Sequence, residues 1–260
     1  MDVLLSVVML LFGVIAGVVG GFLGIGGCSI MLPALYFLFS YPLPVAIGTT
    51  ITAVIITAVS GAQAHIRMRN VDFLTAKIIT IFGALGAVFG SILFIYLKRV
   101  PLLSVVVGLA FTYTAIRMIV EGVRRKTAAQ IEGKEVPGSP KSKAILGFVI
   151  GILSGIIGLG GGYALVPSFI YLLHSPVKIA VGTSLASFIS MAIISGAFKL
   201  VTGDVDLLAA LLLGVGTALG AQIGARLVPK TPAWLIKLLF GLLFLYVSAK
   251  FVLAGLGVRL

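Results

Sequence analysis

Apolar residues occur along this chain in ten segments, which are separated by short polar or glycine- and proline-containing turns except for one long polar stretch at 121–143. The segments cover about residues 3–22, 27–40, 43–64, 72–97, 101–119, 144–157, 161–173, 177–200, 206–227 and 233–255. Several exceed the roughly 20 residues that a helix needs to cross a bilayer. Lipid offers the backbone no hydrogen-bond partner, so apolar stretches of this length predict helices. The pattern predicts an all-α polytopic membrane protein.

The two halves of the chain repeat each other at a spacing of 134 residues. Residues that this shift aligns are Gly24, Gly26, Gly27 and Pro33 with Gly158, Gly160, Gly161 and Pro167, Gly48-Thr49-Thr50 with Gly182-Thr183-Ser184, and Val71-Asp72 with Val205-Asp206. Ser60-Gly61-Ala62 meets Ser195-Gly196-Ala197 only after a slip of one residue. The chain therefore divides into an N-terminal membrane repeat at 1–120, a basic linker at 121–143 and a C-terminal membrane repeat at 144–260.

Each repeat has about five apolar segments, and an odd number makes the second repeat enter the membrane from the opposite side. Inverted repeats of this kind are typical of transporters. With both termini outside, fourteen of the nineteen Lys and Arg residues fall on the inner side and five on the outer side. Cytoplasmic loops are rich in Lys and Arg. We therefore expect a multi-pass protein of the inner (plasma) membrane with the linker in the cytoplasm.

The repeated glycine motifs read GIGGCSIMLP at 24–33 and GLGGGYALVP at 158–167. The first two apolar segments together cover about 39 residues, roughly 58 Å of helix, which is too long for one crossing of a 30 Å core. We therefore expect broken or re-entrant short helices that turn at the glycines and are closed by Pro33 and Pro167. Helix N-termini exposed by such breaks attract anions. Close helix packing through small residues is the alternative explanation.

Other polar residues near the apolar segments are candidates for contact with an anion. Thr49, Thr50, Thr183 and Ser184 carry hydroxyls that could bind one directly, with bonding to the preceding helical turn as the alternative. Gln63, His65 and Arg67 stand at the inner end of one segment, where an interfacial position is the alternative. Lys199 is expected to snorkel to the headgroups unless it pairs with substrate. The full set of predicted substrate-binding residues is Gly24, Gly26, Gly27, Cys28, Thr49, Thr50, Gln63, His65, Arg67, Gly158, Gly160, Gly161, Gly162, Thr183, Ser184 and Lys199.

Composition narrows the function further. Residues are 60% hydrophobic and 10% charged, with a net charge of +12. Membrane topology explains this charge better than nucleic-acid binding does. Every Asp and Glu lies at a segment end or in a loop, which disfavours a cation or metal as cargo, because such sites use carboxylates within the span. Motifs of intramembrane or soluble hydrolases are absent from the sequence. We expect neither an enzyme nor a bound cofactor.

The paired GxGG…P motifs, the paired GT(T/S) openings and the stretch HIRMRNVD at 65–72 together resemble the sulfite exporter TauE/SafE family. This resemblance covers nearly the whole chain. It implies an inner-membrane permease that exports sulfite, sulfonates or related sulfur anions. The chain departs from the family pattern at Cys28, where a third glycine is usual, and at Arg69, where glycine is common.

These observations favour a permease for a small sulfur oxyanion, working by alternating access at a site between the two repeats. A passive anion channel of the same fold is the alternative. The expected partners are the anion and the lipid bilayer, without nucleic acid, and a homodimer is left open.

Overall fold

A computed structural model describes residues 3–23, 26–124, 133–227 and 233–257, and these ranges contain ten helices and no strand. Gly24 lies outside the described residues, and so do four of the nineteen Lys and Arg residues counted for topology: Arg125, Lys126, Lys230 and Arg259. The helices are α1 (Val3–Leu23), α2 (Cys28–Phe37), α3 (Leu43–Arg67), α4 (Phe73–Leu97), α5 (Leu102–Arg124), α6 (Pro140–Ile157), α7 (Gly162–Tyr171), α8 (Val177–Val201), α9 (Leu207–Leu227) and α10 (Ala233–Gly255). The all-helical prediction is confirmed.

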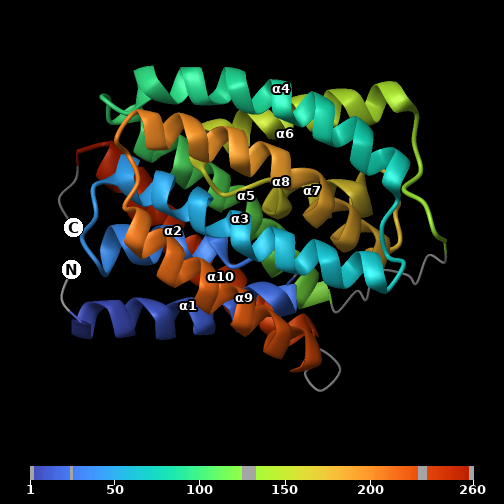
Figure 1. Ribbon diagram of the computed structural model, residues 1–260, viewed down its shortest axis with the longest axis horizontal. Helices are drawn as coiled ribbons and strands as arrows, with labels where there is room; N and C mark the ends of the chain where they lie inside the picture. Colours follow the sequence, from blue (N-terminus) through green and yellow to red (C-terminus); the bar gives the residue numbers. More distant parts are fainter. Residues whose placement is uncertain (1–2, 24–25, 125–132, 228–232, 258–260) are drawn as a thin grey trace.

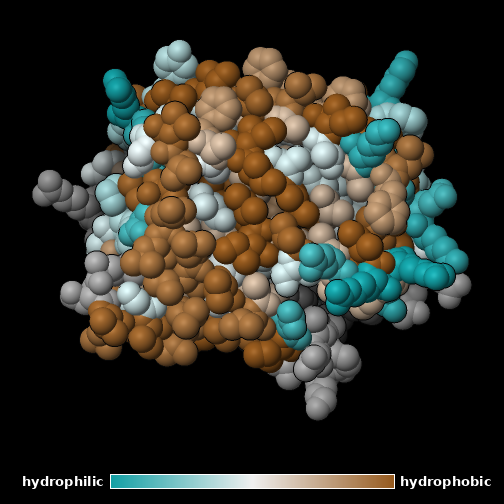
Figure 2. Space-filling model, in the orientation of Figure 1, coloured by the Kyte–Doolittle hydropathy of each residue, from teal (hydrophilic) through white to brown (hydrophobic). Residues whose placement is uncertain are grey.

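Six helices in the described residues, α1, α3, α4, α5, α6 and α8, are long and apolar enough to cross a membrane. Of these, α3 and α8 are the most buried, and they form the centre of the molecule. The helices around them expose large apolar side chains such as Leu11, Phe89 and Tyr246. Figure 2 shows the resulting broad hydrophobic surface, with hydrophilic residues gathered mostly towards one end. An apolar exterior of this extent is suited to lipid rather than water.

The helices of the N-terminal repeat pack mainly against helices of the C-terminal repeat, so the two repeats do not form separate bodies. Helix α1 packs against α9, and α6 packs against α4 in the same manner, as Figure 1 shows. The central helices α3 and α8 contact each other, and α5 pairs with α10. Glycines permit the closest approaches: a Cβ on Gly17 would overlap the backbone of Thr217, and one on Gly151 would overlap that of Gly83. Residues 134 apart thus make equivalent contacts in the two halves.

Register between the repeats is uniform along the central helices. Helix α3 covers residues 43–67, and adding 134 to these numbers gives 177–201, the bounds of α8. The two helices therefore align over their whole length without a shift of one residue. Left-handed backbone conformations recur at the flanking turns, in Ser40 and His174 and again in Arg69 and Gly203. The one-residue slip proposed from the Ser-Gly-Ala sequences is therefore wrong. The true alignment places His65 opposite Lys199.

Segment ends also differ from the prediction. Helix α6 begins at Pro140, with Ser139 accepting a hydrogen bond from the Ser142 N–H, so it has 18 residues and qualifies as a span. The helix is longer than the apolar segment predicted at 144–157, because charged and polar residues at 140–143 extend it. Figure 1 shows that α1 begins and α10 ends at one end of the molecule, opposite the connection that leads into α6. Which end faces the cytoplasm stays a prediction.

Candidate functional site

Both glycine motifs interrupt the helical path. Gly26 and Gly27 have φ angles of 71° and 75°, and Gly158 and Gly160 have φ angles of 70° and 65°. Side chains disfavour these left-handed conformations, which is why glycine occupies them. Residues 26–29 and 158–162 are all buried. Non-helical backbone is thus enclosed by protein, the arrangement that a hydrocarbon environment requires.

The short helices α2 and α7 begin directly after these breaks, at Cys28 and Gly162. No side chain in the described part of the chain caps either N-terminus. The first turns of such helices carry partial positive charge and amide donors without helical partners. Pro33 and Pro167 lie inside α2 and α7, one and a half turns in, so they do not form the breaks. Glycine conformation alone produces the turn.

The two breaks meet at one aromatic side chain, Phe188 of α8. A Cβ added to Gly26 would lie 4.0 Å from Phe188 Cζ, and one added to Gly160 would lie 3.1 Å from Phe188 Cε2. The same Cβ on Gly160 would be 3.4 Å from Val54 Cγ1 of α3. Phe188 is 1% exposed and Val54 is fully buried. These two residues are equivalent in the repeats, so α3 and α8 together close the space between the breaks.

Thr49 and Thr183 hold loops of the opposite repeat. The Asp206 N–H donates to Thr49 Oγ1 at 3.0 Å, and the Asp72 N–H donates to Thr183 Oγ1 at 2.9 Å. Asp206 and Asp72 in turn accept hydrogen bonds from the first turns of α9 and α4. The structure therefore gives Thr49 and Thr183 a bond within the protein, whereas the sequence analysis predicted contact with substrate.

Replacing Thr49 or Thr183 by valine is expected to destabilise the protein. Valine keeps the shape but leaves a buried backbone N–H without its acceptor, at a cost of about 1–3 kcal/mol. A lower melting temperature of the purified chain in detergent is the expected result. An unchanged melting temperature in both variants would contradict this role.

The neighbouring hydroxyls, those of Thr50 and Ser184, differ in kind. Both side chains are fully buried, and neither hydroxyl finds a hydrogen-bond partner among the residues that the structure describes. Thr50 lies between Ile47 and Val54 on one face of α3, at the i, i+3 and i+7 spacing of a helix. Ile47 contacts Gly158 and Val54 faces Gly160. Thr50 therefore lies on the face of α3 that meets the break at 158–161.

Ser184 has the equivalent position on α8. It precedes Phe188 by one helical turn, and the Phe188 ring faces Gly26 and Gly160. Buried hydroxyls normally have a partner, and each exception calls for an explanation. Two unpaired hydroxyls at equivalent positions, each close to a break, are a feature of a polar binding site.

Apart from Cys28, the other predicted side chains lie away from the breaks. Gln63 and Arg67 are exposed near the C-terminal end of α3, in keeping with the interfacial alternative. His65 is partly buried, and its Nδ1 is buried without a partner in the described ranges. Lys199 is fully buried, so it does not snorkel as expected. Cys28, 1% exposed, occupies the first position of α2 where Gly162 occupies that of α7.

Polar contacts close the protein on both sides of the breaks. At one end, the Asp72 carboxylate accepts hydrogen bonds from Thr75 and from the Val136 N–H, while Lys143 contacts Thr75 Oγ1. Burial opposes the ionisation of Asp72, but these hydrogen bonds and the charge of Lys143 hold its pKa below its usual value. The linker, through Val136 and Lys143, is thus attached to the turn between α3 and α4.

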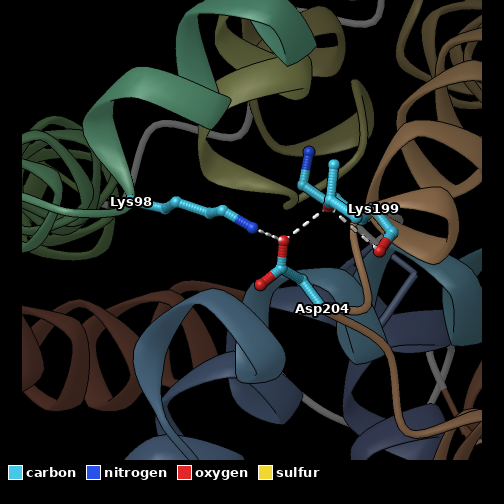
Figure 3. A network of polar contacts seen from close by, with 4 residues as sticks. Lys98, Lys199 and Asp204 are labelled. Atoms are coloured by element: carbon cyan, nitrogen blue, oxygen red, sulfur yellow. Dashed lines mark hydrogen bonds and ion pairs between the residues drawn. The ribbon is translucent and has the colours of Figure 1, made fainter.

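At the other end, the turn between α8 and α9 is held by three contacts. Lys98 forms an ion pair with Asp204, and Thr202 donates to the same carboxylate, as Figure 3 shows. Tyr41 donates to Asp206 at 2.7 Å. Burial, that hydrogen bond and the charge of Asp206 raise the pKa of Tyr41. Polar contacts thus hold both ends of the protein, and Phe188 between them is 1% exposed.

Sequence reasoning missed Phe188, because an aromatic residue in an apolar helix carries no distinguishing signal. It also missed the capping role of Asp72 and Asp206, although the repeat had aligned them with each other. Their shared position before a segment, typical of a helix N-cap, was the available signal. Groups of His, Cys, Asp and Glu that could hold a metal are absent from the described residues.

A family profile described as Sulfite exporter TauE/SafE matches residues 9–251. The chain belongs to this family. The match includes both breaks, both hydroxyl pairs and the central helices. No solved structure matches the chain.

Curated relatives of this TauE/SafE chain are similar over most of its length. "Probable membrane transporter protein YdhB" of Bacillus subtilis (strain 168) is 29% identical over 234 residues, which are 90% of this chain and 93% of the relative. "Probable membrane transporter protein YunE" of the same organism is 26% identical and covers 96% of this chain and 98% of its own length. "Probable membrane transporter protein MJ0441" of Methanocaldococcus jannaschii is 25% identical, with coverage of 94% and 95%. The chain is therefore a member of a membrane transporter family.

Proposed function

We propose that this protein carries a small sulfur oxyanion, such as sulfite or a sulfonate, across the inner membrane by alternating access. The anion binds where the two breaks meet, between the N-termini of α2 and α7. Thr50 on α3 and Ser184 on α8 donate hydrogen bonds from their hydroxyl groups to the anion. The two inverted repeats rock around this site, with the linker in the cytoplasm and both termini outside.

One observation carries the proposal: two equivalent buried hydroxyls, those of Thr50 and Ser184, lack partners in the described structure. Their helical spacing from Val54 and Phe188 places them on the helix faces that meet the glycine breaks. Helix N-termini supply partial positive charge for an anion. No Asp or Glu lies inside the helices that surround the breaks, so nothing there would repel an anion or attract a cation. The family description names a sulfite exporter, which supports a sulfur anion as cargo.

Closure at both ends supports a transporter over the channel alternative. A channel needs a continuous open route, whereas the Phe188 ring between the breaks is 1% exposed. The ion pair of Lys98 with Asp204 and the bonds of Asp72 to the linker close opposite ends of the molecule. An occluded site between two closures is an intermediate of alternating access.

The double variant T50V/S184A is expected to lose at least about tenfold in the initial rate of [³⁵S]sulfite uptake into proteoliposomes. A hydrogen bond to a charged group contributes about 1.5–3 kcal/mol, and both such bonds are removed. The variant should melt at the same temperature as the wild type or higher, since unpaired buried hydroxyls do not stabilise a fold.

Thr52→Val is the matched control. Thr52 lies on the same helix, and its hydroxyl already donates to the Gly48 carbonyl at 2.8 Å. Uptake by this variant should stay close to the wild-type rate. Wild-type uptake in T50V/S184A would contradict the proposed site, and large single-channel currents in planar bilayers would favour a channel.

A further inference from the structure

Lys199 is a buried lysine outside the central site. Its side chain is fully buried, and its Nζ donates to the Gly155 carbonyl at 2.5 Å and to Ser195 Oγ at 2.9 Å. The ring of Phe94 lies under it, 4.2 Å from Nζ to the centroid. An ammonium has three donors, and these contacts with neutral groups use two of them.

No carboxylate of the described residues forms an ion pair with Lys199. The nearby Asp204 is bound instead by Lys98 and Thr202, and Figure 3 shows that the Lys199 amine takes no part in those bonds. Burying a charge without a counter-charge is costly, and proteins normally pair it. Lys199 Nζ bonds only neutral groups among the described residues, while the charge of Asp204 acts on it from nearby, so the amine is well placed to receive an anion.

Two further hydroxyls, on the helices α4 and α6 that enclose Lys199, are unpaired among the described residues. Ser91 of α4 and Ser154 of α6 are fully buried, and neither Oγ has a partner within the described ranges. Both adjoin Gly155, whose carbonyl binds Lys199: Ser154 precedes it in the chain, and a Cβ on Gly155 would lie 2.6 Å from the Ser91 N. Phe94, under the ammonium, stands one turn after Ser91 on α4.

Lys199 lies apart from Phe188 on the same helix, next to the first turns of α3, which also carry Thr50. Lys199 follows Phe188 by eleven residues on α8, which is about 16 Å along a helix. Its Cβ is also 3.2 Å from the Cβ position on Gly48, at the start of α3. The cluster therefore lies between the central site and the closure formed by Lys98 and Asp204.

The other repeat has no matching ammonium. His65 occupies the position equivalent to Lys199, and its Cβ faces Gly182 as that of Lys199 faces Gly48. The repeat equivalent of Ser154 is Gly20, and that of Ser91 is Ala225. The combination of a lysine amine with two serine hydroxyls therefore occurs on one side of the central site and is not repeated on the other.

We propose that Lys199, Ser91 and Ser154 form a second binding station for the transported oxyanion, on the side of the Lys98–Asp204 closure. The ammonium neutralises the anion, and the two hydroxyls donate to its oxygens. The anion occupies this station on its way between the central site and that end of the protein. This inference rests on the proposed function.

Equilibrium binding of [³⁵S]sulfite to the purified full chain in detergent tests the station. The wild type is expected to show two classes of site. The S91A/S154A variant should lose one class while keeping its melting temperature, since the hydroxyls removed bond nothing in the fold. Lys199→Gln should lose the same class, and Lys199→Arg, which keeps the charge, should retain it.

Ser248→Ala is the matched control. Ser248 is a buried serine of α10 that already bonds to Thr112 and Gly108, away from both sites. It should keep both classes of site. Binding of a single class by the wild type, or of both classes by S91A/S154A, would overturn the second station.

The two proposals fail in different ways. Loss of one class in S91A/S154A together with full binding in T50V/S184A would contradict the central site and keep the station. Loss of one class in T50V/S184A with no effect of S91A/S154A would do the reverse. A wild-type chain that binds no sulfite would contradict both.

Discussion

Replacement of Gly26 and Gly160 together by leucine is expected to reduce [³⁵S]sulfite uptake to the background of empty liposomes. Each glycine has a left-handed backbone, which costs a residue with a side chain about 1–2 kcal/mol. Each added side chain would also enter the space beside Phe188 that the proposed anion occupies. The milder Gly160→Ala, whose Cβ would lie 3.1 Å from the Phe188 ring, should reduce uptake without abolishing folding.

Gly203→Leu separates backbone strain from loss of the site. Gly203 has a φ angle of 73° and no atom within 4 Å of an added Cβ, so it suffers the same strain away from the breaks. Proteoliposomes with this variant should take up sulfite at nearly the wild-type rate, once corrected for the amount of folded protein. Equal flux from the wild type and the Gly26/Gly160 double variant would refute a role for the breaks.

Gly48→Ala and Gly182→Ala are expected to cause the largest losses of stability. An added Cβ on Gly48 would overlap the Asp204 carbonyl oxygen, and one on Gly182 would overlap that of Asn70. Backbone cannot move aside as a flexible side chain does, so the helices must shift at a cost of about 3 kcal/mol or more. The melting temperature in detergent, followed by fluorescence of a thiol-independent dye, measures the effect.

Gly196→Ala provides the comparison on the same helix as Gly182. The nearest atom to its added Cβ is Thr52 Oγ1 at 3.4 Å, an ordinary contact. Alanine also favours the helical conformation over glycine by about 1 kcal/mol. This variant should melt at or above the wild-type temperature. Similar melting of all three alanine variants would show that the crossing points at Gly48 and Gly182 tolerate a side chain.

The polar residues show most clearly how far sequence reasoning reached. The pairs Thr49-Thr50 and Thr183-Ser184 are equivalent in the sequence, and all four were predicted to bind substrate. A helix turns by 100° per residue, so neighbours face different directions. Thr49 and Thr183 face loops of the other repeat and bond to them, and Thr50 and Ser184 face the breaks. Only the rotation of α3 and α8 in the packed structure separates these roles.

Lys199 gives a second example. Its position near a segment end predicts snorkelling, because the sequence does not reveal which helices surround that end. In the structure, α4 and α6 pack so closely at Gly155 that the ammonium is enclosed. Its burial is a property of three helices from both repeats.

By itself, the sequence determined the helices, the repeat and the location of the breaks. The length of an apolar segment can be read locally, because each helix in lipid must form its backbone hydrogen bonds within itself. The breaks can be read locally as well, because a turn with positive φ requires glycine. The tertiary structure alone decided which side chains share a space: Phe188 between the breaks, the unpaired hydroxyls beside them and the enclosed Lys199. Those contacts depend on how helices far apart in the chain are rotated against one another, and no local pattern records that rotation.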